Sequence, residues 1–111
     1  MAVNGNIFYQ GQPGTSDAEL YQPGTGLVGY VDSAVVCNPT AGSQTITLAV
    51  VKGGGALADA NTVYHEFTVD AGATTVLSGL LNLRLDASDE IRGLASAAAS
   101  LTLTISGRES S

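Results

Sequence analysis

Apolar and polar residues alternate in several short stretches of the chain. The clearest is 45–50, where the sequence TITLAV sets isoleucine, leucine and valine on one face and the threonines and alanine on the other. A period of two is typical of a half-buried antiparallel strand. Two alanine-rich patches, 56–61 and 95–99, are too short for a regular helix, so the pattern predicts an all-β protein. The strand-like runs lie at 27–36, 45–50, 63–69, 74–77, 81–85 and 101–105.

Turn-forming clusters separate these runs. They are rich in Gly, Asn, Asp and Ser and lie at 38–42, 52–55, 70–72 and 87–89. Short strands at this spacing predict an antiparallel β-sandwich or a jelly-roll-like domain. The sequence Gln-Pro-Gly-Thr occurs twice, at 12–15 and 22–25, and predicts two type II turns with glycine at positive φ.

The N-terminal part differs from the rest of the chain. We predict that residues 1–16 form an extended arm and that residues 17–111 form a single β-sandwich domain, because 111 residues suffice for one core only. The arm either closes an edge of the sandwich or reaches a neighbouring subunit. Phe8 and Tyr9 are its expected anchors, since large apolar side chains are costly to leave in water.

Charge and composition reduce the number of function classes that the chain can belong to. Hydrophobic residues make up 44% of the chain and charged residues 13%, which indicates a folded domain. The net charge is −6, and the four basic residues are scattered, so a stripe that would neutralise nucleic-acid phosphates is missing. No apolar run approaches the roughly 20 residues that span a bilayer, and no export signal is recognised at the N-terminus. We expect neither nucleic-acid nor membrane binding.

The only cysteine and the only histidine are the one candidate nucleophilic pair. Cys37 follows two valines at a strand end, where we expect it to be a small buried hydrophobe. His65 is in phase with Val63 and Phe67, so we expect it to be packed and hydrogen-bonded. A reactive pair would need direct contact and a third orienting group, and remains the alternative. Zinc needs three or four ligands, so we predict no metal, no cofactor and no enzyme.

Two loops carry further alternatives. The stretch Asp86–Glu90 groups three carboxylates without the pattern of a calcium loop, which indicates a solvated turn and leaves a weak cation site open. In Lys52–Gly55 the lysine precedes the glycines, which is the wrong order for a phosphate-binding loop. The loop Gly53–Asn61 is the longest candidate for binding.

Six segments in order carry a family resemblance. Through these segments the chain resembles a loose family of small β-sandwich structural proteins of tailed bacteriophages. The most recognisable features are the Cys37–Asn38 pair at a strand end and a final strand that ends in Ser106–Gly107. The resemblance covers roughly residues 18–107, and it departs from the family at Ser88, where glycine is usual, and at Gly93, where a β-branched residue is usual. The segments read LYQPGT at 20–25, VVCNPT at 35–40, TITLAV at 45–50, TVDAGAT at 68–74, LDASDEIR at 85–92 and LTLTISG at 101–107.

The resemblance implies a virion component made and assembled in the host cytoplasm. We expect a capsid decoration or cement protein that binds the major capsid protein and stabilises the outer capsid surface through subunit-bridging contacts. A homo-oligomer is expected, with a trimer favoured. The second hypothesis is a neck or tail accessory, either connector-associated or a fibre-base adhesin whose loop Gly53–Asn61 contacts a receptor glycan. The candidate partner contacts are Ile7, Phe8, Tyr9, Leu20, Tyr21, Lys52, Arg84, Arg92 and Arg108.

Overall fold

The structure is a computed structural model that describes residues 3–111. It is mostly β-strand, as the alternating pattern predicts, and it includes two short 3₁₀ helices, η1 and η2. The strands are β1 (Val3–Gly11), β2 (Ala18–Tyr21), β3 (Val28–Cys37), β4 (Gln44–Val51), β5 (Thr62–Val69), β6 (Thr74–Val76), β7 (Arg84–Leu85), β8 (Glu90–Ala95) and β9 (Thr102–Ser110), and the helices are η1 (Asp59–Asn61) and η2 (Ser78–Leu80).

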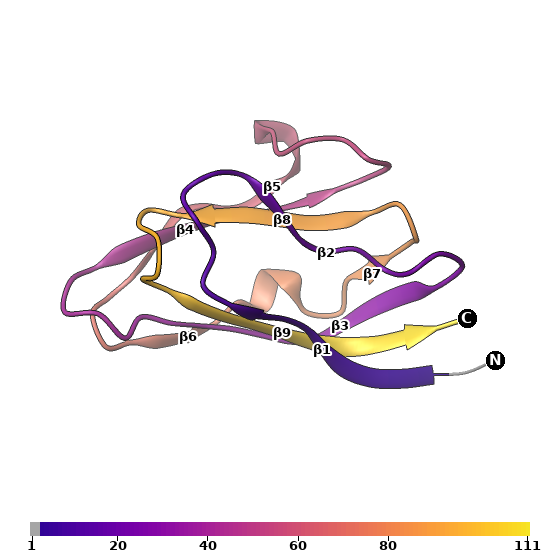
Figure 1. Ribbon diagram of the computed structural model, residues 1–111, viewed down its shortest axis with the longest axis horizontal. Helices are drawn as coiled ribbons and strands as arrows, with labels where there is room; N and C mark the ends of the chain where they lie inside the picture. Colours follow the sequence, from indigo (N-terminus) through magenta and orange to yellow (C-terminus); the bar gives the residue numbers. More distant parts are fainter. Residues whose placement is uncertain (1–2) are drawn as a thin grey trace.

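The strands form two antiparallel sheets that lie as two layers (Figure 1). One sheet has the order β1-β9-β3-β6, with β7 also paired to β3, and the other has the order β2-β8-β4-β5. The chain passes between the sheets several times, so strands far apart in sequence become neighbours. Residue 3 pairs with Ser110, which places the start of β1 beside the end of β9.

The core lies between the layers and follows the period of two. Leu101, Leu103 and Ile105 have no exposed surface, which confirms the inward face predicted for 101–105. On β4, Ile46 and Leu48 are equally buried. Burial of such side chains removes apolar area from water, and each contributes about 1.5–3 kcal/mol of stabilisation. Thr47 and Ala49 on the other face of β4 are buried as well, so the prediction that this strand is half-buried is wrong at these positions.

The predicted phase of 63–69 is wrong at its start. Val63 is 40% exposed and Tyr64 packs against the core instead. The cause is a bulge: Glu66 has a positive φ of 46°, and its N–H donates to Thr47 Oγ1 at 3.0 Å. An inserted residue shifts the alternation by one position. His65 is therefore an exposed side chain, 73% accessible, and not the packed histidine that the period predicts.

Two local predictions also need correction. The type II turns expected at 12–15 and 22–25 are wrong, because Gly14 and Gly24 are absent from the positive-φ glycines of the described chain. Near the second repeat the turn lies two residues later, with Gly26 at φ 78° and the Leu27 N–H donating to the Gly24 carbonyl at 2.9 Å. Of the run 81–85, only the two residues of β7 form a strand.

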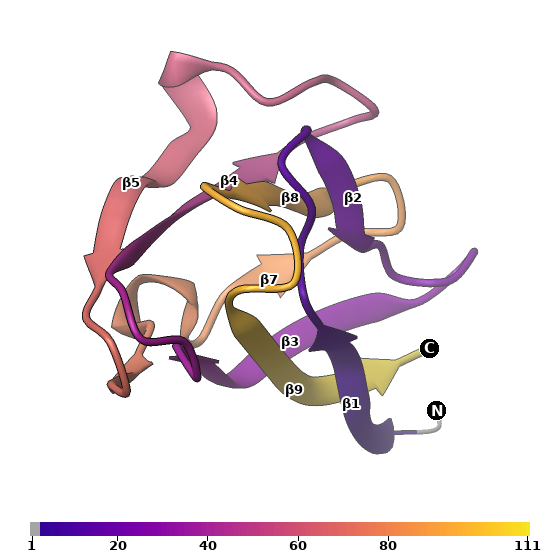
Figure 2. The same cartoon turned by 60° about the vertical axis from the view of Figure 1, so that its left-hand side comes forward.

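Much of the predicted arm belongs to the first sheet. Residues 3–11 are β1, which pairs with β9 of the same chain over its length and lies at the edge of the sheet (Figure 2). The register shifts between Ile7 and Tyr9, which marks a bulge at Phe8. Beyond β1, the carbonyl of Gly14 accepts a hydrogen bond from the Ala95 N–H at 2.8 Å, at the end of β8.

Candidate functional site

Three large apolar side chains are prominently exposed in the part of the chain that the structure describes. Ile7 is 57% exposed, Val63 40% and Val76 62%. They lie on β1, β5 and β6, which are all outer strands of their sheets. Outer strands carry unpaired backbone N–H and C=O groups and are natural places for a partner to bind. The sheet edges are therefore the candidate functional site.

The aromatic residues predicted as arm anchors face inward at the β1 edge. The Phe8 ring stacks on the Tyr21 ring with 3.9 Å between centroids and 4° between planes. Phe8 comes from the first sheet and Tyr21 from the second, so this pair closes the space between the two layers. Tyr9 is also partly buried against the core, and burial raises its pKa above 10.0. Ile7 is the residue of this group that points to solvent.

Leu20 and Tyr21 are core residues. They are 9% and 7% exposed, so neither offers a partner much surface. The Tyr21 hydroxyl donates to Glu109 Oε2 at 2.8 Å, which ties β2 to β9 across the two sheets. Burial, followed by the hydrogen bond to the Glu109 carboxylate, raises the pKa of Tyr21 well above its ordinary value of 10.0.

This raised pKa predicts a loss of stability at alkaline pH. Above about pH 10 the unfolded chain releases the Tyr21 proton while the folded chain retains it, so the free energy of unfolding falls as pH rises. Below about pH 10 the Tyr21 hydroxyl is protonated in both the folded and the unfolded chain, so it does not make the free energy of unfolding depend on pH. We expect Tyr21→Phe to reduce the fall in stability between pH 9 and pH 11, measured by urea unfolding at each pH. An unchanged slope in the variant would contradict the assignment.

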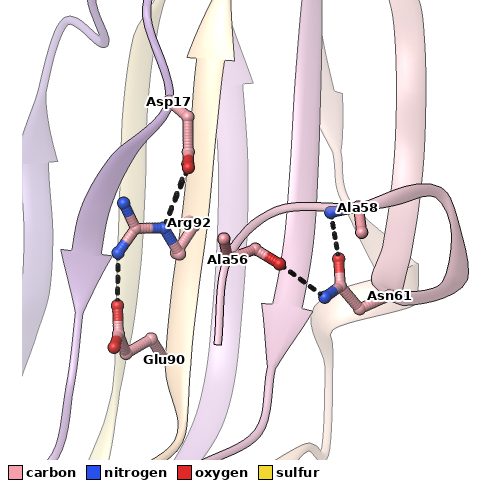
Figure 3. Close-up of polar contacts among 6 residues, drawn as sticks. All are labelled: Asp17, Ala56, Ala58, Asn61, Glu90 and Arg92. Carbon is pink, nitrogen blue, oxygen red and sulfur yellow. Dashed lines mark hydrogen bonds and ion pairs between the residues drawn. The ribbon is translucent and has the colours of Figure 1, made fainter. Parts of the chain in front are cut away.

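Arg92 is engaged within the chain. Its Nε lies 3.0 Å from Asp17 Oδ1 and its Nη1 lies 2.7 Å from Glu90 Oε1 (Figure 3). Asp17 directly precedes β2 and Glu90 begins β8, so the guanidinium joins these two strands. The hydrogen bonds to Asp17 and Glu90 raise the pKa of Arg92. Its side chain is only 21% exposed, which leaves little of it for a partner.

The remaining basic residues are more accessible. Arg84 Nη2 lies 3.3 Å from Asp86 Oδ1, with both side chains more than half exposed. Arg108 pairs with Asp32 at 3.0 Å and lies over the Tyr30 ring, 5.2 Å from its centroid. Lys52 is exposed beside β4 and has no ion pair among residues 3–111.

The structure does not bring Cys37 and His65 together. Cys37 ends β3 in the first sheet, whereas His65 lies on β5 in the second. Cys37 is half-buried, and its neighbour Val36 is the residue that fills the core. The His65 Nε2 lies 3.6 Å from Glu66 Oε2 on an exposed surface. This arrangement gives a nucleophilic pair no support.

The carboxylates of Asp86–Glu90 hold the local backbone. The Asp89 oxygens accept hydrogen bonds from the Gly53 N–H at 3.2 Å and from the Asp86 N–H at 3.0 Å. Glu90 is paired with Arg92. Residues 3–111 contain no group of three or more His, Cys, Asp or Glu side chains placed to hold a metal ion.

A surface hollow lies beside the loop Gly53–Asn61. Asp59, Thr62, Val63 and His65 line it. Asn61 fixes the loop: its Oδ1 accepts from the Ala58 N–H at 2.9 Å and its Nδ2 donates to the Ala56 carbonyl at 3.0 Å (Figure 3). The alternation in 63–69 gives no warning of the bulge, so sequence reasoning misses Val63 as an exposed residue of this hollow.

Comparisons with protein-family models, with curated proteins and with solved structures found no match to this chain. Within the described residues, no helix has the length and apolar character needed to cross a membrane.

Proposed function

We propose that the two sheets form a jelly-roll sandwich. The strands pair as β1 with β9, β2 with β8, β3 with β6 and β7, and β4 with β5. If β6 and β7 are counted as one interrupted strand, these are the pairs of a single long antiparallel ribbon. Such a ribbon, folded into two facing sheets, is the jelly roll. Folding of the ribbon also brings β9 beside β3 in the first sheet and β8 beside β4 in the second, and these strands pair as well.

We further propose that the chain is a non-enzymatic structural protein of a bacteriophage virion, which decorates the outer capsid surface and stabilises it by bridging subunits. The observation that carries this proposal is the folded-ribbon pairing, because jelly rolls are frequent among viral capsid domains. The resemblance of residues 18–107 to small virion proteins supports the same class. The partner is the major capsid protein, and assembly takes place in the host cytoplasm.

The proposed capsid contacts lie on the exposed edges and the accessible basic side chains. Lys52, Arg84 and Arg108 are the basic candidates with the most exposed positions. Because the chain has a net charge of −6, contact with an acidic capsid surface would have to be centred on these few cations or on neutral edges. Arg92, Leu20 and Tyr21 stabilise the fold and are not proposed to contact the capsid directly.

The proposal predicts the outcome of an add-back experiment. Capsids produced without this chain are expected to open at a lower temperature than complete capsids, and the purified chain is expected to bind them and restore the higher value. Ligands that bind only the native form stabilise it by mass action. Binding and opening temperature are measured by co-sedimentation and by fluorescence of a DNA dye. Absence of binding to such capsids would remove the decoration role.

A neck or tail accessory that binds a host surface is the second candidate. The hollow lined by Asp59, Thr62, Val63 and His65 favours it, because this hollow adjoins the loop Gly53–Asn61. Polar side chains beside an exposed apolar residue suit a sugar ring. An adhesin binds a glycan array as an isolated chain and loses binding with Thr62→Val or His65→Ala, whereas a decoration protein shows no glycan binding at all.

A further inference from the structure

The outer strands of the two sheets are unequally protected against pairing with another chain. β2 has four residues and carries Glu19, β6 has three residues, and β7 has two and carries Arg84. β5 is longer, but it is bulged at Glu66. Short length, charge and bulges are the usual devices that keep a sheet edge from adding a strand. β1 has nine residues and contains neither a charged residue nor a proline.

The first half of β1 is a regular and exposed edge. Residues 3–7 pair with β9 without a shift in register, and the bulge comes only after Ile7. The side chains of Asn4, Asn6 and Ile7 are all exposed. Among the residues described, no strand lies beyond β1 in its sheet (Figure 2). This half-strand therefore presents both backbone groups and an apolar side chain to a partner.

The sequence of this half-strand suits pairing with a second copy of itself. Residues 3–7 read VNGNI, a sequence that is nearly symmetric about Gly5: an asparagine stands on each side of the glycine, and a β-branched residue stands at each end. If two copies pair in antiparallel orientation around Gly5, Asn4 lies opposite Asn6 of the partner subunit. A two-fold contact requires such a self-complementary surface. Like charges directly opposite each other destabilise a pair of strands, and this pairing places none opposite each other.

Charge favours contact between copies at the same place. Each chain has a net charge of −6, so two copies repel over most of their surfaces. β1 is the long outer strand that is free of charged side chains. Close approach at this edge leaves the acidic residues of the two copies on other strands.

We propose that residues 3–7 of β1 pair in antiparallel orientation with the same residues of a second copy of this chain, around a two-fold axis at Gly5. The contact extends the first sheet of each copy into one continuous sheet. It yields a dimer, not the trimer that the resemblance favours. The inference goes beyond the proposed capsid role and rests on β1 alone, so its failure would leave capsid binding standing.

A cysteine at position 5 tests the predicted axis. Opposed Cα atoms in antiparallel strands lie about 4.5–5.5 Å apart, which is within the range of a disulfide. A Cβ at Gly5 would meet nothing closer than the Gly107 carbonyl at 3.8 Å, so cysteine is tolerated. We expect Gly5→Cys, made with Cys37→Ser and without an N-terminal tag, to become a disulfide-linked dimer under mild oxidation in dilute solution.

Gly42→Cys in the same Cys37→Ser background is the matched control, because a Cβ there has nothing within 4 Å and the position is an exposed turn. The control is expected to cross-link at least tenfold more slowly than Gly5→Cys. Equal rates for the two variants, or no dimer from Gly5→Cys, would overturn the proposed axis.

Sedimentation equilibrium of the unmodified chain tests the contact without a cross-link. We expect a monomer–dimer equilibrium that Ile7→Lys weakens at least tenfold, since a lysine on an edge strand opposes pairing. Val76→Lys is the matched control on the opposite edge and is expected to leave the equilibrium unchanged. A chain that is monomeric at every concentration, or whose association is insensitive to Ile7→Lys, would refute the proposal.

Discussion

Replacing Asn38 with alanine is expected to lower the free energy of unfolding by about 3 kcal/mol. Asn38 has no exposed surface, and its Nδ2 donates to the carbonyls of Gly42 and Val69, both at 2.8 Å. Its Oδ1 accepts from the Thr40 N–H at 3.0 Å. The side chain therefore fixes the turn after β3 and attaches it to the end of β5. Alanine would leave the buried Val69 carbonyl without its partner, which costs about 1–3 kcal/mol, and would also remove the two part-buried bonds to Gly42 and Thr40.

Urea unfolding followed by circular dichroism measures the effect of Asn38→Ala, and a loss of this size lowers the thermal midpoint by roughly 10 °C or more. Thr40→Val is the control within the same turn. It removes the Thr40 hydroxyl bonds, at least one of which is exposed, and keeps every bond of the Asn38 amide nitrogen. We expect it to cost about 1 kcal/mol or less. If the two variants were equally stable, the turn would not depend on the Asn38 side chain.

Gly107→Ala is expected to destabilise the fold by about 3 kcal/mol through steric overlap. A Cβ at this position would overlap the backbone carbonyl oxygen of Tyr30 and would lie 2.7 Å from Cε2 of the Phe8 ring. The carbonyl belongs to β3, which pairs with β9 along its length, so it cannot move without breaking that ladder. The Phe8 ring is held in turn by its stacking on Tyr21.

Gly14→Ala is the matched control for this substitution, because a Cβ at Gly14 has nothing within 4 Å and its φ is not positive. There the change is expected to be neutral or slightly stabilising, since alanine restricts the unfolded chain. Both variants are compared by their midpoints in urea. A Gly107→Ala protein as stable as Gly14→Ala would mean that β3 and β9 are less closely packed than described.

The sequence predicts the strands best where pairing follows a regular ladder. In 101–105 the period of two identifies the inward face because β9 runs there without a bulge. In 63–69 the same reasoning fails because the register depends on Thr47, a residue of another strand, whose hydroxyl accepts the Glu66 N–H. A bulge fixed by a side chain far away in sequence leaves no local signal.

The candidate contacts show a similar limit. The apolar pattern predicts that Phe8, Leu20 and Tyr21 are buried. It does not predict whether the residues that bury them belong to the same chain or to a partner. In this structure β1 pairs with β9, which lies at the other end of the sequence, and the Phe8 ring of one sheet stacks on the Tyr21 ring of the other. Likewise, Arg92 has Asp17 as one of its two partners, and Asp17 is distant in sequence and becomes near only after β2 pairs with β8.

The copy number of this chain in purified virions tests the virion proposal most directly. Quantitative mass spectrometry gives the ratio of this chain to the major capsid protein in the same particles. A decoration protein is predicted to be present in numbers comparable to the capsid protein. A few copies per particle would place the chain at the neck or tail, and its absence from virions would contradict a structural role in the particle.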